Sequence, residues 1–206
     1  ALAVTFGDQG YLKYLDSFRY PLAGECAMST EVAETLRVPS DWGFEIGVLA
    51  EVYRHFPTTR ICQVDVADGY DHKHRELSAD DPTDGLHRMS VDIARAIYRK
   101  LAIGGVVLSA EGFRSLEAAY DRTALDLIDR YEADAAFNAM AYDRHAEESA
   151  IEVFARSVVR AGQEFLDDPL ETAVIPSWSR VRSELPDLPD RLVAAVEADH
   201  AEESGS

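Results

Sequence analysis

The sequence predicts a mostly helical α/β protein. Apolar residues recur at helical spacing, three or four positions apart, over three long stretches, 86–101, 111–142 and 151–165. A β-type run at 60–66 carries the apolar or β-prone residues Ile61, Cys62, Val64 and Val66. Proline and glycine residues separate these segments. We therefore expect several helices around at least one strand.

Shorter elements are expected on both sides of these segments. Helical spacing predicts helices over 12–18, 29–36, 40–55, 178–185 and 190–197, and a fraying tail from 198 onward. Ser29 or Thr30 can cap the second of these helices and Ser40 or Asp41 the third. Gly43 and Gly47 are expected to leave the first turns of the 40–55 helix bare, so that a substrate can approach.

The charge balance restricts the possible partners. Of 206 residues, 38 are acidic and 20 basic, which gives a net charge of −18, and only three of the basic residues are lysines. Such a surface repels nucleic acid and anionic lipid. It favours a halophilic source, with ordinary acidic solubility as the alternative. No run of apolar residues has the length of a transmembrane helix or the pattern of a signal peptide, so we expect a cytoplasmic protein with no membrane partner.

Two cysteines bear on the redox environment. Cys26 and Cys62 both lie in apolar runs. We therefore expect buried free thiols and a reducing compartment, not a disulfide.

The loop after the β-type run concentrates groups that bind metals and phosphates. His72 and His74 are two residues apart, so in an extended segment both imidazoles leave the same face, with Lys73 and Arg75 on the other. Imidazole is a ligand for divalent metals, and the two cations could hold a phosphate. The alternative is a solvated turn without a ligand.

Two segments upstream carry isolated candidate residues. Glu45 is expected in the first turn of the 40–55 helix, where outward-pointing N–H groups favour negative charge and where it could accept a hydrogen bond from a sugar hydroxyl. From the residues alone, ordinary helix capping is the favoured explanation. Trp42 could stack on a sugar ring or fill the core. Gly24 allows close backbone approach, and Glu25 is a carboxylate in an apolar segment whose alternative role is structural.

Three of these motifs together resemble one enzyme family. They are Tyr20-Pro-Leu-Ala-Gly-Glu25, Trp42-Gly-Phe-Glu-Ile-Gly47, and Gln63-Val-Asp-Val66 followed by Tyr70-Asp-His-Lys-His74. In this order and at these separations they resemble the glucosyl-3-phosphoglycerate synthases. These are retaining glycosyltransferases of the glycosyltransferase-A fold that transfer glucose from a nucleotide sugar to 3-phosphoglycerate with a divalent metal. The resemblance therefore implies a transferase fold and these two substrates.

The resemblance also implies roles for single residues. His72 would complete the site of a divalent metal, Mg²⁺ or Mn²⁺, that holds the diphosphate of the donor, and His74 would face the phosphoglycerate. Glu45 matches the family carboxylate beside the sugar and acceptor. Gly24 and Glu25 match the Pro-Leu-X-Gly-Glu segment that lines the same cleft.

Other family features are missing from this sequence. The family's nucleotide-binding half, its Asp-X-Asp metal motif and its Gly-Arg-Val-Thr acceptor loop are absent. We expect a C-terminal portion, inactive by itself, with residues 1–84 on the acceptor and metal side of the catalytic domain and residues 85–206 forming a helical extension that could support a homodimer. The alternatives are transfer of mannose instead of glucose, or a non-catalytic helical module for assembly.

Overall fold

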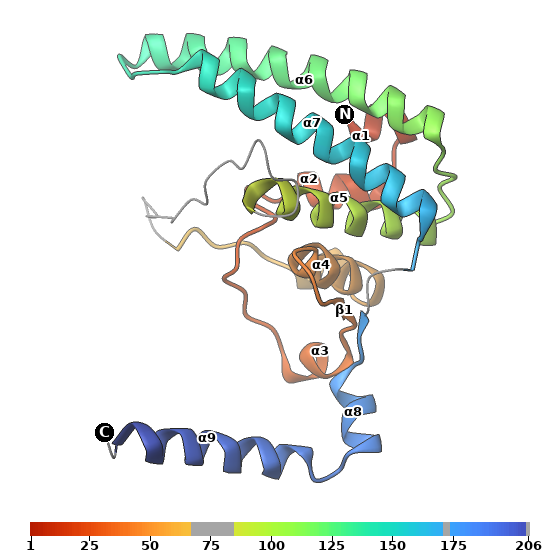
Figure 1. Ribbon diagram of the computed structural model, residues 1–206, viewed down its shortest axis with the longest axis vertical. Coiled ribbons are helices and arrows are strands. Elements are labelled where there is room, and N and C mark those ends of the chain that lie inside the picture. The colour runs from red at the N-terminus through yellow and green to blue at the C-terminus, as the bar shows by residue number, and fades with distance from the viewer. Residues whose placement is uncertain (67–84, 171–173, 205–206) are drawn as a thin grey trace.

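A computed structural model of the chain describes residues 1–66, 85–170 and 174–204 (Figure 1). Within these ranges the fold is mostly helical. The elements are α1 (Leu2–Phe6), α2 (Gly10–Asp16), α3 (Thr30–Thr35), β1 (Val38–Pro39), α4 (Phe44–His55), the 3-10 helix η1 (Thr58–Arg60), α5 (Gly85–Ile103), α6 (Ala110–Phe137), α7 (Arg144–Asp167), β2 (Val174–Ile175), α8 (Trp178–Glu184) and α9 (Leu188–Ser204).

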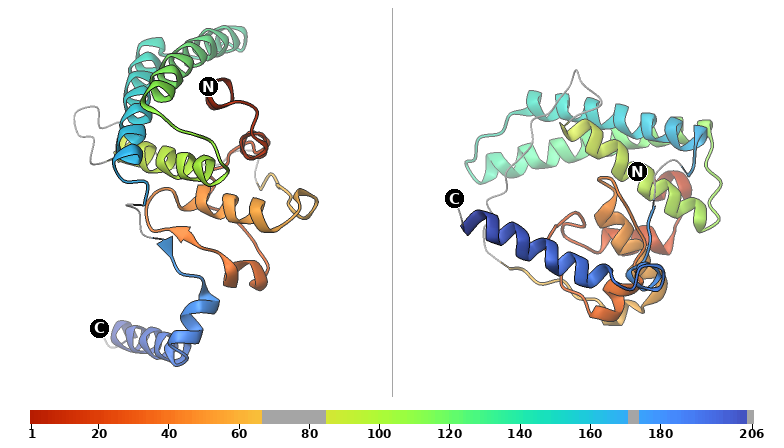
Figure 2. Two further views of the ribbon diagram at one scale, coloured as in Figure 1. Left: turned by 90° about the vertical axis from the view of Figure 1, so that its right-hand side faces the viewer. Right: turned by 60° about the horizontal axis from the view of Figure 1, so that its bottom comes forward.

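A long helical hairpin forms one side of the molecule. Helices α6 and α7 run side by side, α7 packs on α5, and α1 packs on α6 (Figures 1 and 2). The core between them contains Tyr98 of α5 and Phe113 of α6, whose ring centroids lie 4.8 Å apart, with Phe165 of α7 beside Tyr98. The Tyr98 hydroxyl donates to the Val158 carbonyl at 3.1 Å, which satisfies this polar atom.

The opposite side of α5 supports α4 and α2. Tyr14 and Leu15 of α2, Ile46 of α4 and Ala96 of α5 form a second buried cluster. At the far end of α4, the ammonium group of Lys100 lies 3.0 Å from a Glu51 carboxylate oxygen, and both side chains are largely buried. Helix α5 therefore lies between the α6–α7 hairpin on one side and α4 with α2 on the other.

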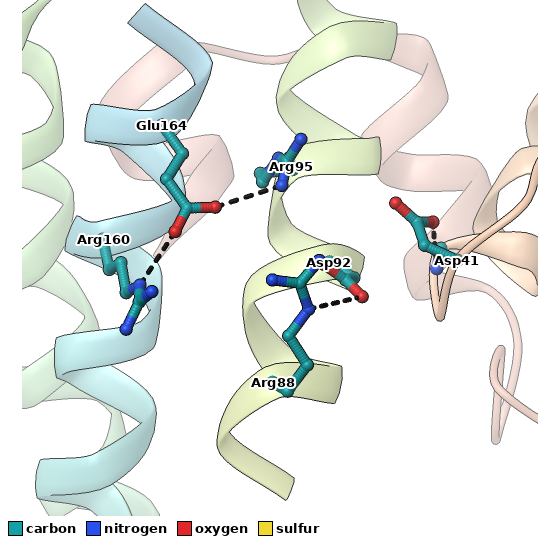
Figure 3. A network of polar contacts seen from close by, with 7 residues as sticks. Asp41, Arg88, Asp92, Arg95, Arg160 and Glu164 are labelled. Atoms are coloured by element: carbon teal, nitrogen blue, oxygen red, sulfur yellow. Dashed lines mark hydrogen bonds and ion pairs between the residues drawn. The ribbon is translucent and has the colours of Figure 1, made fainter. Parts of the chain in front are cut away.

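Buried charges run along α5 (Figure 3). Arg88 binds Asp92 one turn later at 3.0 Å, and Arg95 binds Glu164 of α7 at 3.0 Å. Glu164 also accepts from Arg160 at 2.8 Å. The Glu164 side chain is only 23% exposed, because its partner Arg95 is buried in the core.

A short antiparallel sheet joins two distant parts of the chain. Strand β1 pairs with β2, with Val38 opposite Ile175 and Pro39 opposite Val174. Next to it α3 packs on α8, where Arg182 forms an ion pair with Glu34. Helix α9 extends away from the rest of the described chain (Figures 1 and 2).

The predicted helices are confirmed, with shifted ends. Ser29 caps α3 as expected, its hydroxyl accepting from the Val32 N–H. Ser177 is the N-cap of α8, but its side chain accepts no capping hydrogen bond from the helix. The fraying tail is wrong in part, because α9 continues to Ser204. None of the helices within the described ranges is long and apolar enough to span a membrane.

The predicted strand at 60–66 is not observed. After η1, residues 61–66 form no regular structure, and Val64 and Val66 are both 73% exposed. Side-chain contacts hold the segment instead: the Gln63 side chain accepts from the Arg19 N–H at 2.9 Å, and Arg19 pairs with Asp65. A strand needs a neighbouring strand for its backbone hydrogen bonds, and none of the described residues supplies one.

The expected burial of the two thiols is also wrong. Cys26 and Cys62 are both free and both exposed. Each lies in a segment outside the helices, and Cys62 is exposed although its neighbour Ile61 packs against the cluster of Tyr14, Leu15, Ile46 and Ala96. The apolar character of these runs therefore did not indicate burial.

Candidate functional site

The beginning of α4 positions two of the candidate residues. Gly43 is the N-cap of this helix, and its N–H donates to a side-chain oxygen of Asp41 at 2.9 Å. This is a different cap from the expected one, in which Ser40 or Asp41 would occupy the N-cap position itself. The turn places Trp42 just before the helix and Glu45 in its first turn.

The two glycines of this helix do not form a bare patch. Both are buried, and a Cβ atom on Gly43 would lie 2.7 Å from the Ala96 Cβ and 3.3 Å from the Asp92 carbonyl oxygen. A Cβ atom on Gly47 would overlap the ring of Pro39. The expectation that they let a substrate approach is therefore wrong, because residues of α5 and β1 fill the space that larger side chains would occupy.

The open face of this turn is formed by larger side chains. Trp42 is 42% exposed and Phe44 46% exposed, and Glu45 between them is partly exposed. Unbonded N–H groups at the start of a helix attract anions, so the turn combines an apolar surface with a carboxylate and a positive helix end. Such a combination can stack on a sugar ring and accept a hydrogen bond from one of its hydroxyl groups.

The Gly24–Glu25 pair lies on the segment between α2 and α3. Both residues are exposed, and no atom lies within 4 Å of the position of a Cβ on Gly24. Gly24 therefore leaves open space at this point of the backbone, as a binding segment requires.

The remaining candidates lie outside the described residues. They are His72, Lys73, His74 and Arg75. Within the described ranges, no three histidine, cysteine, aspartate or glutamate residues come together in a group that could hold a metal ion. A divalent cation needs several ligands, so these parts of the chain alone do not form the expected metal site.

An aromatic cavity lies at the other end of α4 and was missed by the sequence reasoning. It measures about 440 Å³ and is bordered by Lys13, Tyr14, Tyr53 and Cys62, among others. The rings of Tyr14 and Tyr53 lie 4.9 Å apart, and burial raises the pKa of Tyr14. None of the described candidate residues, Gly24, Glu25, Trp42 and Glu45, borders this cavity. The helical recurrence of aromatic residues in α2 was the available signal.

Comparison with known proteins identifies related sequences. Over 203 residues the chain is 42% identical to a glucosyl-3-phosphoglycerate synthase of Persephonella marina, a match that covers 98% of this chain and 50% of the relative. Over 189 residues it is 41% identical to a glucosyl-3-phosphoglycerate synthase of Methanococcoides burtonii, covering 91% of this chain and 46% of the relative. No family model and no solved structure matches the chain.

Each match includes nearly the whole of this chain. The chain nevertheless spans only about half the length of these two curated relatives. This share agrees with the expectation that the chain corresponds to one portion of the family's sequence. The comparisons therefore confirm the resemblance read from the three motifs, and the chain is homologous to about half of a glucosyl-3-phosphoglycerate synthase.

Proposed function

We propose that this chain is part of a retaining glycosyltransferase that moves glucose from a nucleotide sugar to 3-phosphoglycerate. The observation that carries the proposal is the 42% identity over 203 residues to a protein named for this reaction. We propose further that the whole protein has the glycosyltransferase-A fold, in which residues 61–66 would form a strand beside a strand outside this chain. Their exposed valines, and the lack of a partner strand for them among the described residues, support this part of the proposal.

The first turn of α4 would act on the acceptor. In the proposed reaction Glu45 accepts a hydrogen bond from the attacking hydroxyl group of 3-phosphoglycerate and so orients it. The partial positive charge of the helix end would hold the Glu45 carboxylate in place, and Trp42 would cover the apolar face of the sugar. Gly24 and Glu25 would line the same cleft.

The loop residues would bind the charged parts of the two substrates. His72 would contribute one ligand to a Mg²⁺ or Mn²⁺ ion, and His74, Lys73 and Arg75 would contact the phosphoglycerate. One imidazole does not hold such an ion, and the described residues contain no group of three ligands, so the metal would need further groups beyond His72 and the described residues.

The decisive experiment is a transfer assay on the full-length protein. Nucleotide-activated glucose and mannose are offered separately with 3-phosphoglycerate and Mg²⁺ or Mn²⁺, and the product is identified by mass spectrometry. We expect glucosyl-3-phosphoglycerate from the full-length protein and no product from this chain alone. A mannosyl product made faster than the glucosyl product, or no transfer by the full-length protein, would refute the proposal.

Two matched pairs of variants test the residue roles. Glu45→Gln should lower kcat by about 100-fold or more, as expected for loss of a positioned hydrogen-bonding carboxylate. Glu111→Gln, which changes a glutamate in the first turn of α6, should keep the activity. His72→Ala should abolish metal-dependent transfer, whereas His145→Ala, at an exposed position of α7, should not.

A further inference from the structure

The first turn of α4 packs closely on α5. The methyl group of Ala96, which is 6% exposed, lies at the point of contact, and the Asp41 carboxylate and the Asp92 carbonyl oxygen border the same space. This methyl group packs where Gly43 has no side chain, because a Cβ there would be 2.7 Å from the Ala96 Cβ. Ile46, one turn further along α4 and 2% exposed, shares a buried cluster with Ala96.

Other contacts fix the same turn from its sides. The Asp41 carboxylate accepts from the Gly43 N–H at 2.9 Å. Asp41 is also close enough to Asp92 of α5 for its charge to contribute to raising the pKa of Asp92, although burial of Asp92 is the larger cause. At the far end of α4 the buried Lys100–Glu51 pair ties the helix to α5 a second time. Because both ends of α4 are held, the distance between Ala96 and Gly43 determines how far the first turn of α4 lies from α5.

We propose that Ala96 is a positioning residue: its methyl group, seated on Gly43, sets the distance of the first turn of α4 from α5 and so the location of Glu45. This inference rests on the proposed function, because Glu45 has a role there only if the protein is the transferase. Glu45 is two residues from Gly43 on the opposite, solvent-facing part of the turn, so a shift of the turn carries its carboxylate with it.

The size of the effect follows from the geometry. Nonbonded carbon atoms meet at about 3.5–4.0 Å, so a methyl group on Gly43 would move the turn by about 1 Å. A misplacement of about 1 Å at a catalytic group can cost about 100-fold in rate. A loss of this size in kcat, without a matching change in the KM for the nucleotide sugar, would indicate a displaced Glu45.

The test moves one methyl group across the contact in the full-length transferase. Gly43→Ala should lower kcat about 10- to 100-fold, since the turn is displaced by about 1 Å. Ala96→Gly should lower kcat by about threefold or more, because the turn is no longer held at a fixed depth and small errors of geometry reduce rate. The double variant, with Gly43→Ala and Ala96→Gly together, should recover a measurable part of the kcat lost in Gly43→Ala, because the shortest overlap is gone while the contacts of the new Cβ with the Asp41 carboxylate at 3.0 Å and the Asp92 carbonyl at 3.3 Å remain.

Controls separate this effect from loss of folding and from failure of the proposed function. Val153→Ala removes buried methyl groups on α7 and should lower the Tm while leaving kcat unchanged. Unchanged kcat in Gly43→Ala, or no recovery in the double variant, would overturn the inference, and if Gly43→Ala does not fold, unchanged kcat in Ala96→Gly would overturn it. If Glu45→Gln keeps full activity, the role of Glu45 in the proposed function fails instead.

Discussion

Removing the Glu164 carboxylate should destabilise the fold much more than removing one of its partners. Glu164 lies between Arg95, whose side chain is 4% exposed, and Arg160, whose side chain is 36% exposed (Figure 3). Breaking a fully buried ion pair costs about 3–5 kcal/mol, because the remaining charge stays buried without compensation. Glu164 is itself 23% exposed and Arg95 has a further interaction, so we expect about 2–3 kcal/mol for Glu164→Ala.

The matched control is Arg160→Ala. This change removes the more exposed partner and leaves the Arg95–Glu164 pair intact, so we expect a loss of about 0.2–1 kcal/mol, as for surface ion pairs. Glu164→Gln should fall between the two, because the amide keeps one acceptor for Arg95. Urea unfolding followed by circular dichroism gives all three values, provided that the slope m stays constant. Equal losses for Glu164→Ala and Arg160→Ala would refute the reasoning that burial decides the cost.

Three further predictions concern packing, pH and salt. Gly162→Ala should destabilise the chain by about 1 kcal/mol or more. The new Cβ would lie 2.5–2.8 Å from ring atoms of Phe113, and this overlap outweighs a helix-propensity gain of about 1 kcal/mol. A urea unfolding midpoint equal to or above that of the wild type would contradict this prediction. Burial raises the pKa of Asp92 above its ordinary value of 3.8, although Arg88 opposes the shift, so the folded state binds the proton more tightly than the unfolded state. The stability of the wild type relative to Asp92→Asn should therefore fall as the pH rises through the range just above 3.8. The opposite slope in acid titrations would show that the Arg88 pair dominates. The net charge of −18 predicts that raising NaCl from about 0.05 to about 1 M increases the urea midpoint, and an unchanged midpoint would argue against adaptation to salt.

Local sequence signals predicted the helices but not what surrounds them. The 3.6-residue period and the capping residue Ser29 placed α3 within one residue of its observed ends, whereas α7 begins at Arg144 instead of 151 and α6 ends at Phe137 instead of 142. In the helix around 86–101 the apolar residues Met89, Ile93, Ile97 and Leu101 recur at helical spacing. In the structure Asp92 and Arg95 of α5 are as buried as any apolar residue, because Arg95 pairs with a glutamate 69 positions away. A pairing at that distance leaves no periodic trace in the sequence.

The predicted strand shows a second limit of local signals. Residues 61–66 have strand composition, yet their hydrogen-bonding partner has to come from elsewhere. The short sheet that the described residues do form, β1 with β2, joins residues 38–39 to 174–175 and was not predicted as a pair. β-pairing depends on which segments meet in space, so the propensity of one segment cannot establish it.

The motif over residues 42–47 shows why the resemblance to a family identified the protein's relatives when reasoning from single residues did not. From single residues the two glycines were interpreted as an opening for a ligand, whereas Gly43 and Gly47 are closed by α5 and β1. Trp42 and Phe44, on either side of Gly43, are exposed, and Glu45 is partly exposed. One short turn thus meets two demands, close packing on one side and exposed groups on the other. A pattern that satisfies both at fixed spacing is more restrictive than either alone, which explains how the motif could identify the family although the reason first given for its glycines was wrong.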